Sequence, residues 1–141
     1  MQIEPSSITI AVDFDGTCVE ADYPYVGKDL PHAVQVLKRL QAENCKIILW
    51  TMRDGFELLE AVHWFEKNGI TLFGIQRNPE QKDWTENYGS PKCCATYYID
   101  DRAIGVPLVL TRDRTKPPAV NWVLVEELLE QKGVLSPFFF S

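Results

Sequence analysis

The most constraining feature of the sequence is residues 8–12, a short run of β-branched and small apolar residues. A run of this kind that is closed by a glycine predicts a buried strand ending in a turn. The acidic turn, residues 13–17, follows directly and reads DFDGT. If extended backbone continues through Asp15, the carboxylates of Asp13 and Asp15 lie on one side, because side chains alternate along a strand. Two such carboxylates repel unless a cation lies between them or one holds a proton.

Apolar periodicity predicts alternating strands and helices along the rest of the chain. We expect strands at residues 46–50, 70–73, 95–99 and 107–110, and helices at about 29–44, 56–67 and 121–132. Asp29 is the expected N-cap of the first helix, with Pro31 in its first turn. Strands and helices at this spacing predict an α/β protein with a mainly parallel sheet and helices on both faces. At 141 residues we expect one domain, residues 1–141.

Polar side chains follow three of the predicted strands. Asp13 and Asp15 follow the first, Thr51 follows the second, and Asp100 with Asp101 follows the strand at 95–99. Ligands of an open parallel sheet bind beyond the carboxyl ends of its strands. Any one of these residues is equally explained as a turn or cap residue. Their joint placement nevertheless predicts a functional site.

The acidic turn resembles the DxDGT signature of the haloacid dehalogenase-like (HAD) phosphohydrolases, whose first Asp is the nucleophile. The resemblance covers residues 8 to about 110 and rests on four short motifs in the family's order. It implies a three-layer, Rossmann-like HAD fold. Thr51 resembles the phosphate-binding residue of the second motif, with Met52 and Arg53 beside it as expected substrate-binding residues. For the Arg53 side chain, contact with a substrate anion and simple solvation are equal alternatives.

Hydrolysis of a phosphate monoester needs a nucleophile, an acid for the leaving oxygen and positive charge near the phosphoryl oxygens. Asp13 is the expected nucleophile, because a carboxylate can form an aspartyl-phosphate. Asp15 is the expected acid and base. An acidic site with only oxygen ligands suits Mg²⁺. The expected activity is therefore a Mg²⁺-dependent phosphatase acting on a small phosphorylated metabolite, such as a sugar phosphate or a nucleotide.

The resemblance also implies the metal ligands. HAD enzymes use the side chain of the first Asp, the backbone carbonyl of the second Asp and an acid on a later strand. These correspond to Asp13, Asp15 and Asp100, with Asp101 expected to hold a metal-bound water. One of the paired acids alternatively serves as a helix or turn cap.

The third family motif is a lysine that neutralises charge between the nucleophile and the phosphate. Lys92 is the expected residue, because it lies eight residues before Asp100. A close lysine followed by paired aspartates resembles the pattern of deoxyribonucleotidases. Lys82 is the alternative.

HAD phosphatases usually carry a cap domain after the first or the second motif. Residues 16–28 predict only a small flap, and residues 51–92 hold one helix, one short strand and a loop. The chain therefore resembles the capless subclass, whose open sites accept large substrates or are closed by neighbouring subunits. A homo-oligomer that closes the site is one expectation. The apolar tail, residues 137–140, suits packing on the body or on another subunit.

Charge and composition argue against other classes of partner. The net charge is −6 and the isoelectric point is about 4.9, which disfavours a nucleic-acid or anionic-membrane surface. No apolar run approaches the roughly 20 residues that span a bilayer. Cys18, Cys45, Cys93 and Cys94 form no CxxC pair and are expected to be free thiols, which suits a cytoplasmic location.

Three other functions compete with a phosphatase. A response-regulator receiver also combines Asp, Thr, Lys and Mg²⁺, but it places the phosphorylated Asp on a middle strand, where this chain has Thr51. A phosphotransferase uses the same aspartyl-phosphate. A HAD fold that serves only as an assembly subunit is the third alternative, and the intact Asp13 and Asp15 disfavour it.

Overall fold

The computed structural model describes residues 8–83, 89–111 and 113–137. The predicted packing of the apolar tail falls mainly on residues 138–140, which lie outside the described residues. Among the described residues, no helix combines the length and apolar character that a membrane crossing requires.

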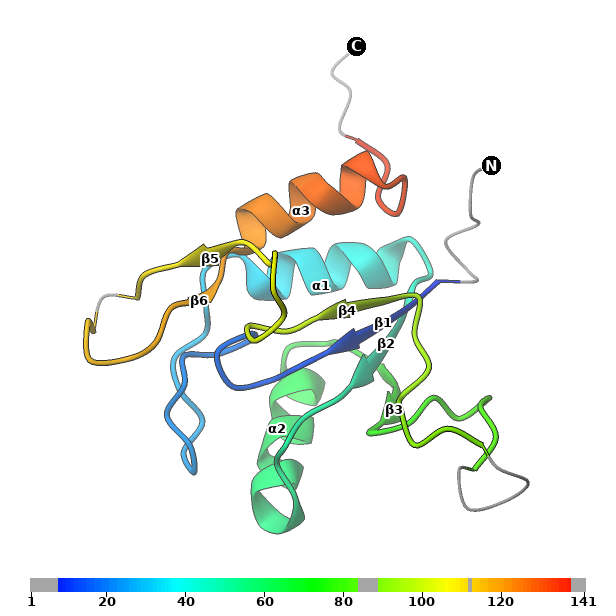
Figure 1. The fold of residues 1–141 in the computed structure, drawn as a ribbon, viewed down its shortest axis with the longest axis horizontal. Coiled ribbons are helices and arrows are strands. Elements are labelled where there is room, and N and C mark those ends of the chain that lie inside the picture. The colour runs from blue at the N-terminus through cyan, green and yellow to red at the C-terminus, as the bar shows by residue number, and fades with distance from the viewer. Residues whose placement is uncertain (1–7, 84–88, 112, 138–141) are drawn as a thin grey trace.

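A four-stranded parallel sheet forms the centre of the molecule (Figure 1). Its strands are β1 (Thr9–Val12), β2 (Lys46–Leu49), β3 (Leu72–Ile75) and β4 (Tyr97–Ile99), in the order β3-β2-β1-β4. Every neighbouring pair is parallel, so the carboxyl ends of β1, β2 and β4 meet at one edge. The predicted α/β class with a mainly parallel sheet is confirmed.

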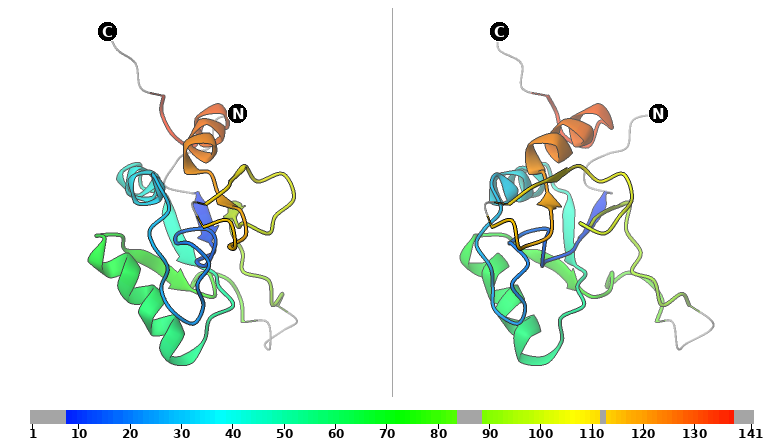
Figure 2. Two further views of the ribbon diagram at one scale, coloured as in Figure 1. Left: turned by 90° about the vertical axis from the view of Figure 1, so that its left-hand side faces the viewer. Right: turned by 60° about the vertical axis from the view of Figure 1, so that its left-hand side comes forward.

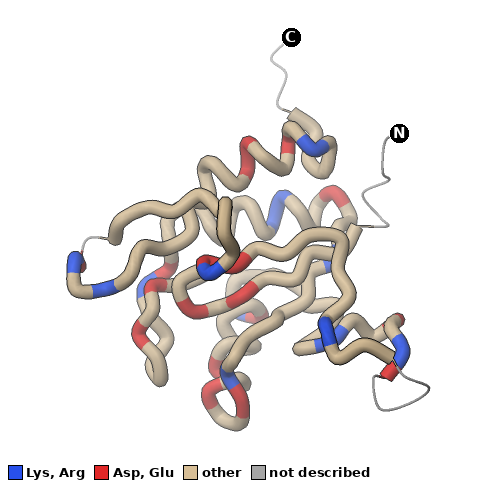
Figure 3. Tube along the Cα trace, in the orientation of Figure 1, with Lys and Arg blue, Asp and Glu red and all other residues tan. Residues whose placement is uncertain are grey.

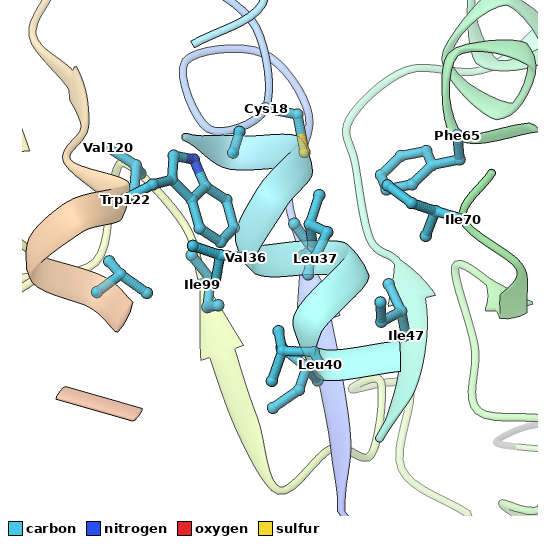
Figure 4. Close-up of a cluster of buried hydrophobic side chains, with 14 of the residues drawn as sticks. Cys18, Val36, Leu37, Leu40, Ile47, Phe65, Ile70, Ile99, Val120 and Trp122 are labelled. Carbon is cyan, nitrogen blue, oxygen red and sulfur yellow. The ribbon is translucent and has the colours of Figure 1, made fainter. Parts of the chain in front are cut away.

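Three helices pack on the sheet: α1 (Ala33–Ala42), α2 (Gly55–Lys67) and α3 (Trp122–Gln131). Their buried side chains join a single apolar cluster with alternate residues of the strands, such as Val12 and Leu49. Figure 4 shows part of this cluster, with Leu37 of α1 and Trp122 of α3 among its members. All three helices therefore contact the same apolar cluster, on one face of the sheet (Figure 2).

The opposite face is covered differently. Ala11 and Ile48 on this face contact Cys93, and half-buried Trp50 and Tyr98 pack around them. No helix of the described residues joins this second cluster, so the expectation of helices on both faces is wrong for the part of the chain described. The connection from β3 to β4 crosses this face, and its described residues are irregular because the segment is polar and interrupted by proline and glycine.

The first helix begins later than the sequence indicates. Its N-cap is His32, and Asp29 lies outside it. The Asp29 carboxylate instead accepts a hydrogen bond of 2.8 Å from the indole Nε1 of Trp64 in α2. The predicted capping role of Asp29 is wrong, because a tertiary partner takes up its side chain. His32 contacts Glu126 of α3 at 2.9 Å and so has a packing role.

The predicted strand at 107–110 lies outside the parallel sheet. It corresponds to β5 (Leu108–Val109), which pairs antiparallel with β6 (Ala119–Val120) in a separate two-stranded sheet. The predicted C-terminal helix matches α3 closely, and the side chain of Asn121 caps it by accepting from the backbone nitrogen of Leu124.

The four cysteines are free thiols, and Cys94 is the exposed one.

Candidate functional site

The ladder between β1 and β4 brings Asp13 and Asp100 together. The backbone nitrogen of Asp13 donates to the carbonyl of Ile99 at 3.0 Å, so the pairing with β4 extends one residue beyond the end of β1, and Asp100 follows Ile99 directly. One carboxylate oxygen from each of Asp13, Asp100 and Asp101 lies within 4.8 Å of the others, and all three residues are half-buried. We call these three residues the acidic cluster. Acidic segments gather beyond the ends of β1 and β4 in Figure 3.

The last two residues of the acidic turn hold Asp101 against Asp13. The buried Thr17 hydroxyl donates to Oδ2 of Asp13 at 3.0 Å and accepts from the backbone nitrogen of Asp101 at 3.1 Å. Gly16 has φ of 78°, and a Cβ there would lie 2.3 Å from Oδ2 of Asp101. Glycine is therefore needed both for the backbone conformation and for the space. Thr17 was absent from the expected site residues, although the GT of the motif was the available signal.

Electrostatics make this arrangement costly without a counter-charge. Burial, the nearby charge of Asp100 and a hydrogen bond with Asp101 raise the pKa of Asp13 to about 8. Burial also raises the pKa of Asp101. Either protons or a cation must offset the repulsion. The donors are all oxygens, which fits a hard divalent cation such as Mg²⁺.

The two paired acids differ in their other contacts. Oδ1 of Asp100 accepts from the backbone nitrogen of Arg102 at 2.9 Å, so Asp100 caps a turn as well as belonging to the acidic cluster. Asp101 has its backbone tied to Thr17. Both acids are therefore available to a metal, and which of them binds it directly stays a prediction.

The side chain of Asp15 does not join the acidic cluster. Its two oxygens accept from Nε and Nη2 of Arg53, both at 2.8 Å. The condition for the Asp13 and Asp15 carboxylates to lie on one side, extended backbone through Asp15, is not met. The backbone stops being extended at Phe14, whose carbonyl accepts from the backbone nitrogens of Thr17 and Cys18 at 3.1 and 2.8 Å. Metal binding by the Asp15 backbone carbonyl stays a prediction.

Arg53 is buried, with 1% of its surface exposed. Its guanidinium is therefore not solvated, and that alternative is wrong. Contact between Arg53 and a substrate anion stays a prediction. The hydrogen bonds with Asp15 are the largest cause of its raised pKa. Met52, one residue earlier, is 99% exposed and lies at the surface beside Thr51.

Thr51 is held at the end of β2 by a residue that sequence reasoning missed. Gln76 accepts from the backbone nitrogen of Thr51 at 2.9 Å and donates to its carbonyl at 2.6 Å. The Thr51 hydroxyl accepts from the backbone nitrogen of Arg53 at 3.1 Å. Among the described residues this hydroxyl has no acceptor for its own hydrogen, so it is able to donate to an anion. No local sequence pattern marked Gln76, which follows β3.

Lys92 lies on the face of the sheet that carries Asp100. Its Nζ is 4.9 Å from the centre of the Tyr98 ring, and Tyr98 shares a face of β4 with the residue two positions later, Asp100. Within the described ranges, no ion pair joins Lys92 or Lys82 to the acidic cluster. The contact with Tyr98 assigns Lys92 to the face of the sheet that carries Asp100. Its role beside the phosphate, and the choice between Lys92 and Lys82, stay predictions.

A mainly parallel α/β protein with a carboxylate site at its strand ends is thus the class that the fold and the site define. No protein-family model matches the chain, and no curated protein matches it. The solved structure of a conserved protein coded by a locus from Bacteroides thetaiotaomicron is similar: the sequences are 34% identical, the match covers 89% of this chain and 91% of that one, and the TM-score is 0.71. The chain therefore belongs to the same family as that conserved protein.

Replacing Gly16 by alanine should weaken divalent-cation binding, because the new Cβ would displace the Asp101 carboxylate. Gly133→Ala is the matched control: its φ is 76° and no heavy atom lies within 4 Å of the added Cβ. Both variants should lose about 1–2 kcal/mol to left-handed backbone strain. Only Gly16→Ala should also need more Mg²⁺ to raise the melting temperature. Equal Mg²⁺ responses in the two variants would contradict the role given to Gly16.

Stability should depend on pH in a direction that the acidic cluster determines. Without divalent cations, stability should fall as pH rises from 3.8 to about 8, because folded Asp13 keeps a proton that the unfolded chain has released. Mg²⁺ should oppose this fall, so it should raise the melting temperature more at about pH 8 than at about pH 5.

Thermal unfolding in EDTA and in excess Mg²⁺ measures both effects. Asp13→Asn should remove most of the pH-dependent fall and most of the Mg²⁺ response. Asp22→Asn is the control, because Asp22 lies in the flap and its carboxylate makes a long ion pair, 3.8 Å, with Lys116. A Mg²⁺ response that is independent of pH would argue against the cluster as the binding site.

Proposed function

We propose that the protein is a Mg²⁺-dependent phosphatase that hydrolyses a small phosphate monoester through an aspartyl-phosphate on Asp13. The observation that carries this proposal is the convergence of Asp13, Asp100 and Asp101 at the ends of two neighbouring parallel strands. Three half-buried carboxylates in this arrangement are costly unless protons or a cation offset their repulsion. The DFDGT turn that supplies Asp13 supports the HAD assignment.

The finer fold assignment is part of the same proposal. We take the fold to be the Rossmann-like HAD fold without a cap domain. Between Asp13 and Thr51 the chain forms a flap and α1, and between Thr51 and Lys92 the described residues form α2, β3 and irregular segments. Neither segment includes a further domain among the described residues.

Asp13 is the residue proposed to attack phosphorus. One of its oxygens forms the new bond to phosphorus while the bond to the leaving oxygen breaks, which yields an aspartyl-phosphate and an alcohol. Water then attacks phosphorus, the bond to Asp13 breaks, and inorganic phosphate leaves. Thr17 holds Oδ2 of Asp13 during this chemistry, since its hydroxyl donates to that oxygen.

The proton transfers are assigned to Asp15. It would protonate the leaving oxygen in the first step and take a proton from water in the second. Its carboxylate is bound to Arg53 in this structure, so it must turn toward the substrate to act.

Positive charge and hydrogen-bond donors complete the site. Asp13, Asp100 and Asp101 would hold Mg²⁺, which when bound supplies positive charge against the phosphoryl oxygens. The Thr51 hydroxyl is free to donate to one of these oxygens. Lys92 is the proposed cationic side chain, because it lies over Tyr98 on the same face as Asp100. A sugar phosphate or a nucleotide is the proposed kind of substrate.

Mg²⁺-dependent release of phosphate from p-nitrophenyl phosphate tests the activity. Asp13→Asn should lower kcat by about a thousandfold or more, because the amide cannot form the covalent intermediate. Asp22→Asn, which removes a carboxylate from the flap, should stay within about twofold of the native rate. Full activity in Asp13→Asn, or activity that survives EDTA, would overturn the proposal. Transfer to an added alcohol in place of phosphate release would favour a phosphotransferase.

The same assay distinguishes the two candidate lysines. Lys92→Ala should lower kcat by about 10- to 1,000-fold, because a positive charge near the transferring group would be lost. Lys82→Ala should leave the rate nearly unchanged, since Lys82 is exposed and Lys92 is the lysine that contacts Tyr98 on the face of Asp100. The reverse pattern would assign the role to Lys82.

A further inference from the structure

The buried guanidinium of Arg53 joins Asp15 to two other parts of the molecule. Nε and Nη2 donate to the two oxygens of Asp15, both at 2.8 Å. Nη2 also donates to the carbonyl of Tyr25 at 2.6 Å, and Nη1 donates to the carbonyls of Pro24 and Glu57 at 3.3 and 3.2 Å. Every nitrogen of the guanidinium is therefore engaged, by one acidic side chain and three backbone carbonyls.

Two aromatic rings, those of Phe14 and Tyr23, lie close to the guanidinium. Its carbon is 5.0 Å from the centre of the Phe14 ring and 5.2 Å from that of Tyr23. The backbone of Arg53 is tied to the end of β2, because its nitrogen donates to the Thr51 hydroxyl and its carbonyl accepts from Gln76 at 3.3 Å. The side chain thus extends from the candidate phosphate-binding residue to the flap.

The flap is held at its base by its own backbone. Glu20 donates to the carbonyl of Lys28 at 2.8 Å, and Leu30 donates to the carbonyl of Cys18 at 3.0 Å. Its tip is exposed, with 59% of the Tyr23 surface and 71% of the Tyr25 surface accessible to solvent.

The tip of the flap contacts the body through Arg53 and through half-buried Val26, which packs against the apolar cluster. The carbonyls of Pro24 and Tyr25 bind the guanidinium directly. The ion pair between Asp22 and Lys116 is long, at 3.8 Å, and lies between partly exposed side chains, so it contributes little.

We propose that Arg53 is a positioning residue that couples the flap to the Asp15 side chain. The same guanidinium nitrogens bind the Asp15 carboxylate and the flap carbonyls, so a change at one partner alters the geometry available to the other. A buried charged group that loses its counter-charge also becomes unfavourable where it lies. Movement of the Asp15 carboxylate away from Arg53 therefore weakens the flap contacts, and by reciprocity an open flap weakens the hold on Asp15.

The coupling has a catalytic meaning that rests on the proposed function. For Asp15 to serve as acid, its carboxylate must leave Arg53 and reach the leaving oxygen. The contacts between Arg53 and the flap then weaken in the same step, so the flap opens as the Asp15 carboxylate moves. Substrate entry and proton transfer are linked through one side chain.

Hydrogen–deuterium exchange of the flap amides tests the coupling without an activity assay. The reporter is the amide of Tyr25 at the tip of the flap, and the amide of Trp50, bonded to the Val12 carbonyl within the sheet, is the reference. Asp15→Asn, Arg53→Gln and the double variant should each speed flap exchange about tenfold or more relative to Trp50. Flap exchange in the double variant should be no faster than in either single variant, because all three variants lose the same connection between Asp15 and Arg53.

Glu130→Gln is the matched control. It removes a carboxylate that pairs with Arg39 at 2.7 Å between α1 and α3, away from the flap. Its flap exchange should match the native protein. Fast flap exchange in Arg53→Gln together with native exchange in Asp15→Asn would overturn the coupling, since Arg53 would then hold the flap independently of Asp15. Where Arg53→Gln does not fold, Arg53→Lys provides the same comparison with a charge that makes fewer hydrogen bonds.

Kinetics separate this inference from the proposed function. In an active enzyme, Arg53→Lys should lower kcat more than it changes KM, and the Mg²⁺ dependence should remain native, because the acidic cluster is untouched. A change confined to KM would overturn the catalytic part of the coupling. Absence of any phosphatase activity in the native protein would overturn the proposed function and leave the exchange result standing.

Discussion

The repulsion among three carboxylates at the ends of β1 and β4 is the constraint on which the rest of the structure depends. Parallel pairing of the two strands makes the proximity of Asp13 and Asp100 unavoidable, because each follows the end of its strand directly. The surrounding residues hold this unfavourable arrangement in place. Thr17 bonds to both Asp13 and Asp101, and the indole of Trp122 donates to the Thr17 carbonyl at 2.6 Å from α3. The C-terminal helix therefore stabilises a turn more than one hundred residues earlier.

The sequence predicts the site residues whose positions follow from the ends of the strands. A buried strand has a recognisable composition, and parallel strands bring their carboxyl ends to one edge, so Asp13, Thr51 and Asp100 could be expected to converge. The orientation of Asp15 could not be predicted in the same way. It depends on where the backbone leaves the extended conformation and on Arg53, a partner 38 positions later. The contact between Gln76 and Thr51 could not be predicted for a similar reason, since Gln76 lies in irregular backbone after β3.

The arrangement of helices was the main fold feature that periodicity did not predict. An alternation of strands and helices indicates that crossover connections are present. It does not indicate which of these connections lacks a helix. The chain runs β1 to β2 to β3 in one direction across the sheet, and right-handed crossovers place α1 and α2 on the same face. The return from β3 to β4 crosses the other face. Its polar composition predicts a loop, but composition does not show that the loop takes the place of a helix on that face.

This irregular connection bears directly on the site. Side chains alternate along β1 and β4, so Asp13 shares a face with Ala11, and Asp100 shares a face with Tyr98. That face is the one without helices among the described residues, and Cys93 of the connection packs on it. The face that carries the acidic cluster is thus also the face crossed by an irregular segment that includes Lys92. In such a segment the position of a cationic side chain depends on local contacts, here the Tyr98 ring, and not on helical or strand register.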